Sequence, residues 1–99
     1  MYLYGIEITL FIEADGKCCK TEILSDEEYI KMIDAKLDEE LAEYHEDQNI
    51  EELADLMEVI YAAAEARGYS VEELEAVRLA KVEKRGTFKE KTLLREVVE

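Results

Sequence analysis

Several residue types are scarce or missing in this chain of 99 residues, which has no proline, no tryptophan, four glycines and two cysteines. No low-complexity stretch or convincing repeat is present, and the length is that of one domain. Cys18 and Cys19 are adjacent, so they cannot easily pair with each other, and there is no third cysteine. We therefore expect reduced thiols rather than a disulfide framework.

Basic residues are also few. Twelve lysines and arginines against 26 acidic residues give a net charge of −14, which disfavours binding to nucleic acid or to anionic membranes. No apolar run approaches the roughly 18 residues of a membrane span. Residues 1–12 are apolar but lack a basic start and a small-residue cleavage site, so we expect no signal peptide. These patterns indicate a cytoplasmic protein without a nucleic-acid or membrane partner.

Three helix starts are marked by capping-box patterns: Ser25 with Glu28, Asn49 with Glu52, and Ser70 with Glu73. The predicted helices run over about residues 26–46, 50–67 and 71–84. Gly68 and Gly86 follow the second and third helices, where a helix commonly ends. Because the loops between the helices are short, we expect antiparallel neighbours.

The second predicted helix is apolar over most of its circumference. At about 100° per residue, one face holds Leu53, Leu56, Met57, Ile60 and Ala64. A face beside it holds Val59, Ala62, Ala63 and Ala66. One protomer has too few helices to cover both faces, so we expect a homodimer or homotetramer with Val59, Ala62 and Ala63 near a helix–helix contact.

The N-terminal part, residues 1–24, is predicted to be an extended arm or hairpin that folds as one unit with the helical part, residues 25–99. Ile6, Ile8, Leu10 and Ile12 alternate as in a strand. Asp15-Gly16 is a hairpin-turn pattern, and residues 21–24 are the candidate partner strand. The alternative is a short helix that ends at Gly16.

Two carboxylate pairs lie on consecutive predicted helices, Glu40 with Glu43 and Glu52 with Asp55. Acids three residues apart lie on one helix face, and two helices joined by a short loop can turn such faces toward each other. Glu52 and Asp55 fall on the alanine-rich face rather than on a solvated stripe. Clustered carboxylates repel unless a cation lies between them, and they favour Mg²⁺, Mn²⁺ or Ca²⁺ over Zn²⁺.

The run Glu39-Glu40-Leu41-Ala42-Glu43 followed by Glu52-Leu53-Ala54-Asp55 resembles the signature of the all-α nucleoside triphosphate pyrophosphohydrolases, the superfamily of the MazG and phosphoribosyl-ATP pyrophosphohydrolases. Asp15-Gly16-Lys17, residues 23–29 and residues 81–88 are similar to a short, house-cleaning MazG-like branch. The resemblance covers roughly residues 13–97. It implies an all-α, antiparallel helical bundle of MazG-like type whose core is completed by oligomerisation.

The resemblance also implies an enzyme that cleaves a nucleoside triphosphate, or a related nucleotide, to the monophosphate and pyrophosphate. The matching Mg²⁺ ligands, with Mn²⁺ as an alternative ion, are Glu40, Glu43, Glu52 and Asp55. Glu39 is the candidate that positions or deprotonates the attacking water.

Lys81, Lys84 and Arg85 are the candidate phosphate-binding cations, although they also suit the negative C-terminal end of the third helix. Related chains begin with a basic stretch of the form Lys-Leu-Val-Arg-Asp-Lys-Ile-Pro. Here no lysine or arginine precedes Lys17. The alternative function is therefore a catalytically impaired or regulatory helical oligomer of the same fold.

Overall fold

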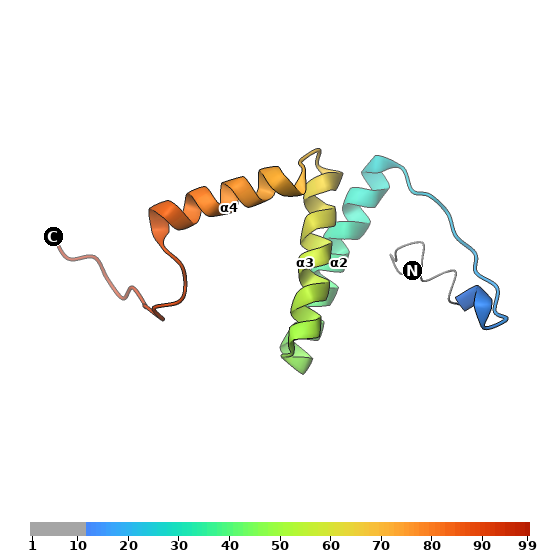
Figure 1. Cartoon of the computed structure of the whole chain (residues 1–99), viewed down its shortest axis with the longest axis horizontal. Helices are drawn as coiled ribbons and strands as arrows, with labels where there is room; N and C mark the ends of the chain where they lie inside the picture. Colours follow the sequence, from blue (N-terminus) through green and yellow to red (C-terminus); the bar gives the residue numbers. More distant parts are fainter. Residues whose placement is uncertain (1–11) are drawn as a thin grey trace.

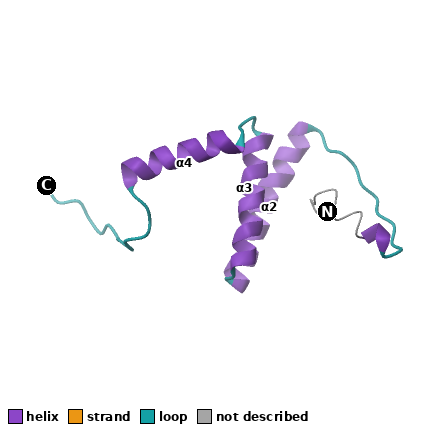
Figure 2. Ribbon diagram, viewed as in Figure 1, coloured by secondary structure: helices purple, strands orange, loops and turns teal. Residues whose placement is uncertain are grey.

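The computed structural model describes residues 12–99, and every regular element in that range is helical (Figures 1 and 2). The long helices are α2 (Asp26–Asp47), α3 (Ile50–Ala66) and α4 (Val71–Arg85). No strand occurs within residues 12–99. The prediction of an all-α protein is confirmed for this part of the chain.

Each long helix begins where its capping residue predicts. The side-chain oxygens of Ser25, Asn49 and Ser70 accept hydrogen bonds from backbone N–H groups three residues later, over 3.2, 2.9 and 3.0 Å. These bonds satisfy donors that the first helical turn leaves without an intrahelical partner. All three helices end within one residue of the predicted position.

Helices α2 and α3 form an antiparallel hairpin, in which they lie side by side (Figure 1). The turn between them is short because Gln48 takes the left-handed conformation, with φ 51°, and donates its N–H to the carbonyl of Tyr44. Ile33 of α2 and Val59 of α3 are the buried apolar residues among residues 12–99. The hairpin is thus the packed part of the protomer.

Helix α4 does not return along the hairpin but leads away from the C-terminal end of α3 (Figure 1). It contacts α3, and none of its residues contacts α2. Here the structure differs from the prediction that short loops give antiparallel neighbours. Val77 and Leu79 of α4 stay more than half exposed, because α4 gains little burial within its own chain.

The protomer leaves much apolar surface uncovered. Its radius of gyration is 18.0 Å, against about 13 Å for a compact chain of this length. Leu53, Met57 and Ile60, on one face of α3, are between 38% and 50% exposed. Within one copy, the described residues 12–99 therefore do not close a hydrophobic core around α3.

The alanine-rich face of α3 is covered by α2 of the same chain. Val59 is buried, and Ala62 and Ala63 are half-buried. These three residues, which were predicted near a helix–helix contact, lie at the contact of α3 with α2 within the protomer. The second apolar face of α3, which carries Leu53 and Met57, is exposed. In the hairpin, α2 packs against the face of α3 that has the smaller side chains.

The N-terminal segment is not a hairpin in its described part. Residues 12–14 form one helical turn, and Gly16, with φ 83°, donates its N–H to the carbonyl of Glu13. Residues 17–25 have no regular structure, so the partner strand predicted at 21–24 is absent there. The helix ending at Gly16, the alternative interpretation, fits this turn. The strand predicted from Ile6 lies mostly outside the described residues.

Within residues 12–99, no helix combines the length and the apolar character needed to cross a membrane.

Candidate metal centre

The carboxylates predicted to bind a metal lie close together near the short turn that joins α2 to α3. Carboxylate oxygens of Glu40, Glu52 and Asp55 lie within 4.8 Å of one another, and so do those of Glu39, Glu40 and Glu43. Glu40 belongs to both groups and therefore links the acids of α2 to those of α3. All four predicted metal ligands, and the predicted water-positioning Glu39, are thus brought together.

Glu40 is the buried member of this cluster, with only 6% of its surface exposed. Its Oε2 atom and the Oε2 atom of Glu52 are both shielded from solvent and have no hydrogen-bond partner. Buried carboxylate oxygens without a partner are costly. A hard cation that prefers several oxygen ligands would satisfy both atoms, so the donor set fits Mg²⁺ or Mn²⁺.

Lys36 is a member of the site that the sequence analysis did not identify. Its Nζ lies 3.3 Å from Oε1 of Glu40 and 3.4 Å from Oε1 of Glu39. The spacing of three and four residues within a helix was the available signal. Lys36 therefore contacts Oε1 of Glu40, whereas Oε2 of Glu40 has no hydrogen-bond partner.

The electrostatics of Lys36 reflect this position. Burial acts to lower its pKa, but the hydrogen bonds and charges of Glu40 and Glu39 outweigh burial and raise the pKa above its ordinary value. Lys36 therefore stays protonated and compensates part of the negative charge of the cluster.

The acids of the cluster raise one another's pKa. The pKa of Glu43 is raised chiefly by the negative charge of Glu40, with burial and the charge of Glu52 adding to it. The pKa of Glu52 is raised first by burial and then by the charges of Asp55 and Asp47. Lys36 therefore leaves the cluster with excess negative charge, which a divalent cation would neutralise.

The predicted phosphate-binding cations are not at this centre. Lys81, Lys84 and Arg85 lie near the C-terminal end of α4, and α4 makes no contact with α2. Lys84 and Arg85 also lie in the last turn, where they complement the helix dipole. Within one protomer, the acids and these cations are separate.

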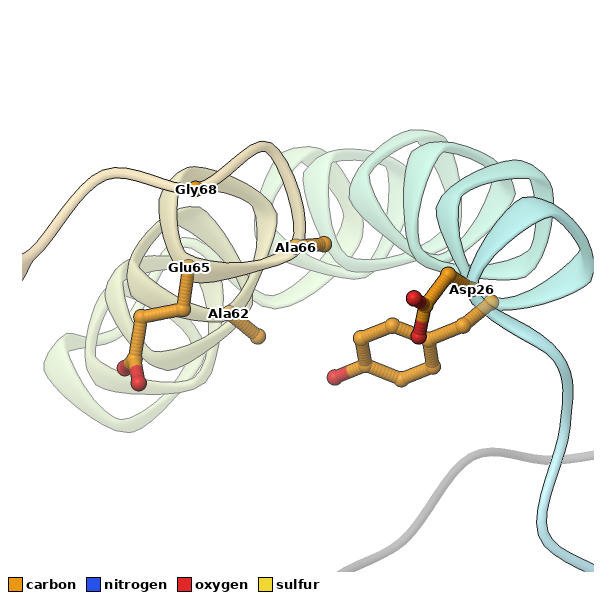
Figure 3. Close-up of a pocket in the computed structure, with 6 residues that line it drawn as sticks. Asp26, Ala62, Glu65, Ala66 and Gly68 are labelled. Atoms are coloured by element: carbon orange, nitrogen blue, oxygen red, sulfur yellow. The ribbon is translucent and has the colours of Figure 1, made fainter.

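A cavity of about 550 Å³ lies at the opposite end of the hairpin (Figure 3). It is lined by Asp26 and Tyr29 from the start of α2 and by Ala62, Glu65, Ala66 and Gly68 from the end of α3 and the turn that follows. The ion pair between Arg67 and Asp34, 2.9 Å long, also joins α2 to this end of the hairpin. None of the predicted metal ligands lines this cavity.

No protein-family model matches the chain, and no curated protein or solved structure matches it.

Proposed function

We propose that the chain is a Mg²⁺-dependent pyrophosphohydrolase that cleaves a nucleoside triphosphate, or a related nucleotide, to the monophosphate and pyrophosphate, with Mn²⁺ as an alternative ion. The observation that supports it is the pair of buried, unpartnered oxygens of Glu40 and Glu52 within a cluster of carboxylates from two helices. The resemblance of this acid pattern to the MazG-like pyrophosphohydrolases connects the cluster to nucleotide chemistry.

The division of roles follows from the positions of the acids. Glu40, Glu43, Glu52 and Asp55 would hold the ion, which when bound neutralises phosphate charge and orients the reacting groups. Glu39 is half-buried at the margin of the cluster and remains open to solvent. Its proposed role is to accept a proton from a water that attacks phosphorus while the anhydride bond to the departing pyrophosphate breaks.

The proposed assembly is a homodimer or homotetramer, because the apolar face of α3 with Leu53, Met57 and Ile60 is uncovered in one protomer. The alternative function is a catalytically impaired or regulatory oligomer of the same fold. It is favoured by the absence of any lysine or arginine before Lys17, which leaves few cations to bind a triphosphate.

The test is pyrophosphate release from a panel of nucleoside triphosphates by the full chain in Mg²⁺. We expect release that is abolished in the double variant Glu52→Gln/Asp55→Asn. It should be retained in the control Glu51→Gln/Glu58→Gln, which makes the same change in charge at exposed positions of α3. Metal binding without pyrophosphate release from any nucleotide would contradict the hydrolase and favour the alternative.

A further inference from the structure

The cavity at the end of the hairpin opposite the carboxylate cluster has the size of a site for a small organic molecule. Its volume of about 550 Å³ lies within the range of roughly 300–1,000 Å³ that is typical of ligand pockets. Its walls come from both helices: Asp26 and Tyr29 belong to α2, and Ala62, Glu65 and Ala66 belong to α3 (Figure 3). A molecule bound in this cavity would therefore contact α2 and α3 together.

The charged groups that line this cavity are two carboxylates. Asp26 lies on the α2 side and Glu65 on the α3 side (Figure 3). Neither forms an ion pair with another of the described residues. Arg67, which directly follows α3, is paired with Asp34 over 2.9 Å. The cavity thus presents one uncompensated negative charge on each of its two helical walls.

The helix ends at this cavity also favour a cation. The C-terminal end of α3 carries the negative end of the helix dipole, and the last turn of α3 contains no basic residue. The positive end of α2 is compensated by Asp26, Glu27 and Glu28 in its first turn. Residues 26–66 have 15 acidic and 2 basic side chains, a net charge of −13, which attracts cations and repels anions. The charge of the cavity therefore selects a cationic ligand.

The wall between the two carboxylates is apolar. The methyl groups of Ala62 and Ala66 point from α3 toward the α2 side (Figure 3), and side chains this small leave room for an aliphatic chain. Tyr29 of α2 is half-buried and lines the same cavity, and an aromatic ring attracts an ammonium group. A linear molecule with an ammonium group at each end and methylene groups between them matches this order of charged and apolar surface.

We propose that this cavity is a binding site for an aliphatic diamine or polyamine. Its terminal ammonium groups pair with Asp26 and Glu65, and its methylene chain lies over Ala62 and Ala66. The ligand joins α2 to α3 and stabilises the hairpin, because it binds the folded chain only. None of its residues belongs to the carboxylate cluster, so the site is independent of the proposed hydrolase.

The site can be located by two-dimensional ¹H–¹⁵N NMR spectra of the full chain, with cadaverine, an unbranched diamine, as the probe. The titration is done in about 150 mM NaCl, which screens interactions between exposed charges. We expect saturable shifts of the amide signals of Ala66 and Gly68, which line the cavity. Pentylamine, which has the same chain and one ammonium group, should bind about three- to fivefold more weakly because it loses one exposed ion pair.

Two variants separate the charge of the cavity from its shape. Asp26→Asn/Glu65→Gln should weaken cadaverine binding about tenfold, because two exposed ion pairs are lost. The control Glu51→Gln/Glu58→Gln makes the same change in net charge at exposed positions of α3 and should stay within about twofold of the parent. Ala66→Leu keeps both carboxylates, fills part of the cavity and should also weaken binding. Circular dichroism establishes that each variant keeps the helical content of the parent.

Shifts centred on Glu43 and Glu52 instead of Ala66 and Gly68 would place the diamine at the carboxylate cluster and overturn the proposal. Equal affinities for cadaverine and pentylamine, or an equal loss in the two double variants, would show that the attraction is only that of an acidic surface. Unweakened binding by Ala66→Leu would show that the chain of the ligand does not enter the cavity. Each of these results contradicts the proposed site and leaves the proposed hydrolase untouched.

Discussion

Replacing Lys36 with methionine tests whether this lysine compensates the buried acid Glu40. The change keeps most of the apolar stem and removes the ammonium group that lies 3.3 Å from Glu40 Oε1. The side chains of Lys36 and Glu40 are 13% and 8% exposed, so the pair is largely buried. Removing one partner of a buried ion pair costs about 3–5 kcal/mol. We take the lower end, about 3 kcal/mol, because Glu39 beside the pair is open to solvent.

For a domain of this size, a loss of about 3 kcal/mol lowers Tm by about 12–24 °C. The assay is thermal unfolding followed by circular dichroism, in EDTA and in Mg²⁺. The gain in Tm from Mg²⁺ should be larger in Lys36→Met than in the parent, because the cation then replaces the compensation that the lysine provided.

The matched control is Lys31→Met, which removes a lysine from an exposed position of the same helix and should change Tm little. Equal melting temperatures of Lys36→Met and Lys31→Met in EDTA, with an equal gain from Mg²⁺, would refute the compensation of Glu40 by Lys36. Glu40 would then be satisfied by something other than the lysine and the metal.

Three further predictions follow from the acid cluster and the exposed face of α3. The pKa values of Glu43 and Glu52 are raised above those of ordinary glutamates by the neighbouring acids and by burial. The metal-free folded chain therefore binds protons more readily than the unfolded chain, and the two acids destabilise it as pH rises and they ionise. The parent should therefore gain more Tm from Mg²⁺ at pH 8 than at pH 5, and Glu43→Gln/Glu52→Gln should remove most of that pH dependence; an unchanged dependence would assign it to other acids. Met57→Glu should convert the proposed oligomer to monomers in sedimentation velocity, whereas Glu58→Gln should not; a monomeric parent at micromolar concentration would contradict the proposed assembly. Glu39→Gln should lower the rate of pyrophosphate release by about 10²–10⁴-fold while Mn²⁺ affinity stays within about threefold, and a full rate would remove Glu39 from the reaction.

The features that the sequence predicted are those fixed by neighbours within a few residues. Ser25 caps α2 through a bond to a backbone group three residues away, and the same spacing places Glu52 and Asp55 on one helix face. A two-residue turn then suffices to bring that face against α2. Local patterns therefore predicted both the helices and the acid cluster.

The features that the sequence did not predict depend on tertiary packing. The burial of Lys36 depends on the packing of α2 against α3. The direction of α4 depends on how much apolar surface α4 buries by packing. The residues around Val59 were predicted near a helix–helix contact of an oligomer, and the contact that the structure shows for them is with α2 of the same chain. Helix periodicity identified two apolar faces of α3, but it does not determine which of them α2 covers in the hairpin.

The metal centre is tested most directly by the affinity of the chain for Mn²⁺, measured by electron paramagnetic resonance of the free ion. The parent and the control Glu51→Gln/Glu58→Gln should bind Mn²⁺ with similar affinity. Glu52→Gln/Asp55→Asn should bind at least about tenfold more weakly, a loss of about 1.4 kcal/mol. Equal binding by all three proteins would show that the carboxylates of Glu52 and Asp55 are not ligands, and would contradict the metal centre on which the proposed function depends.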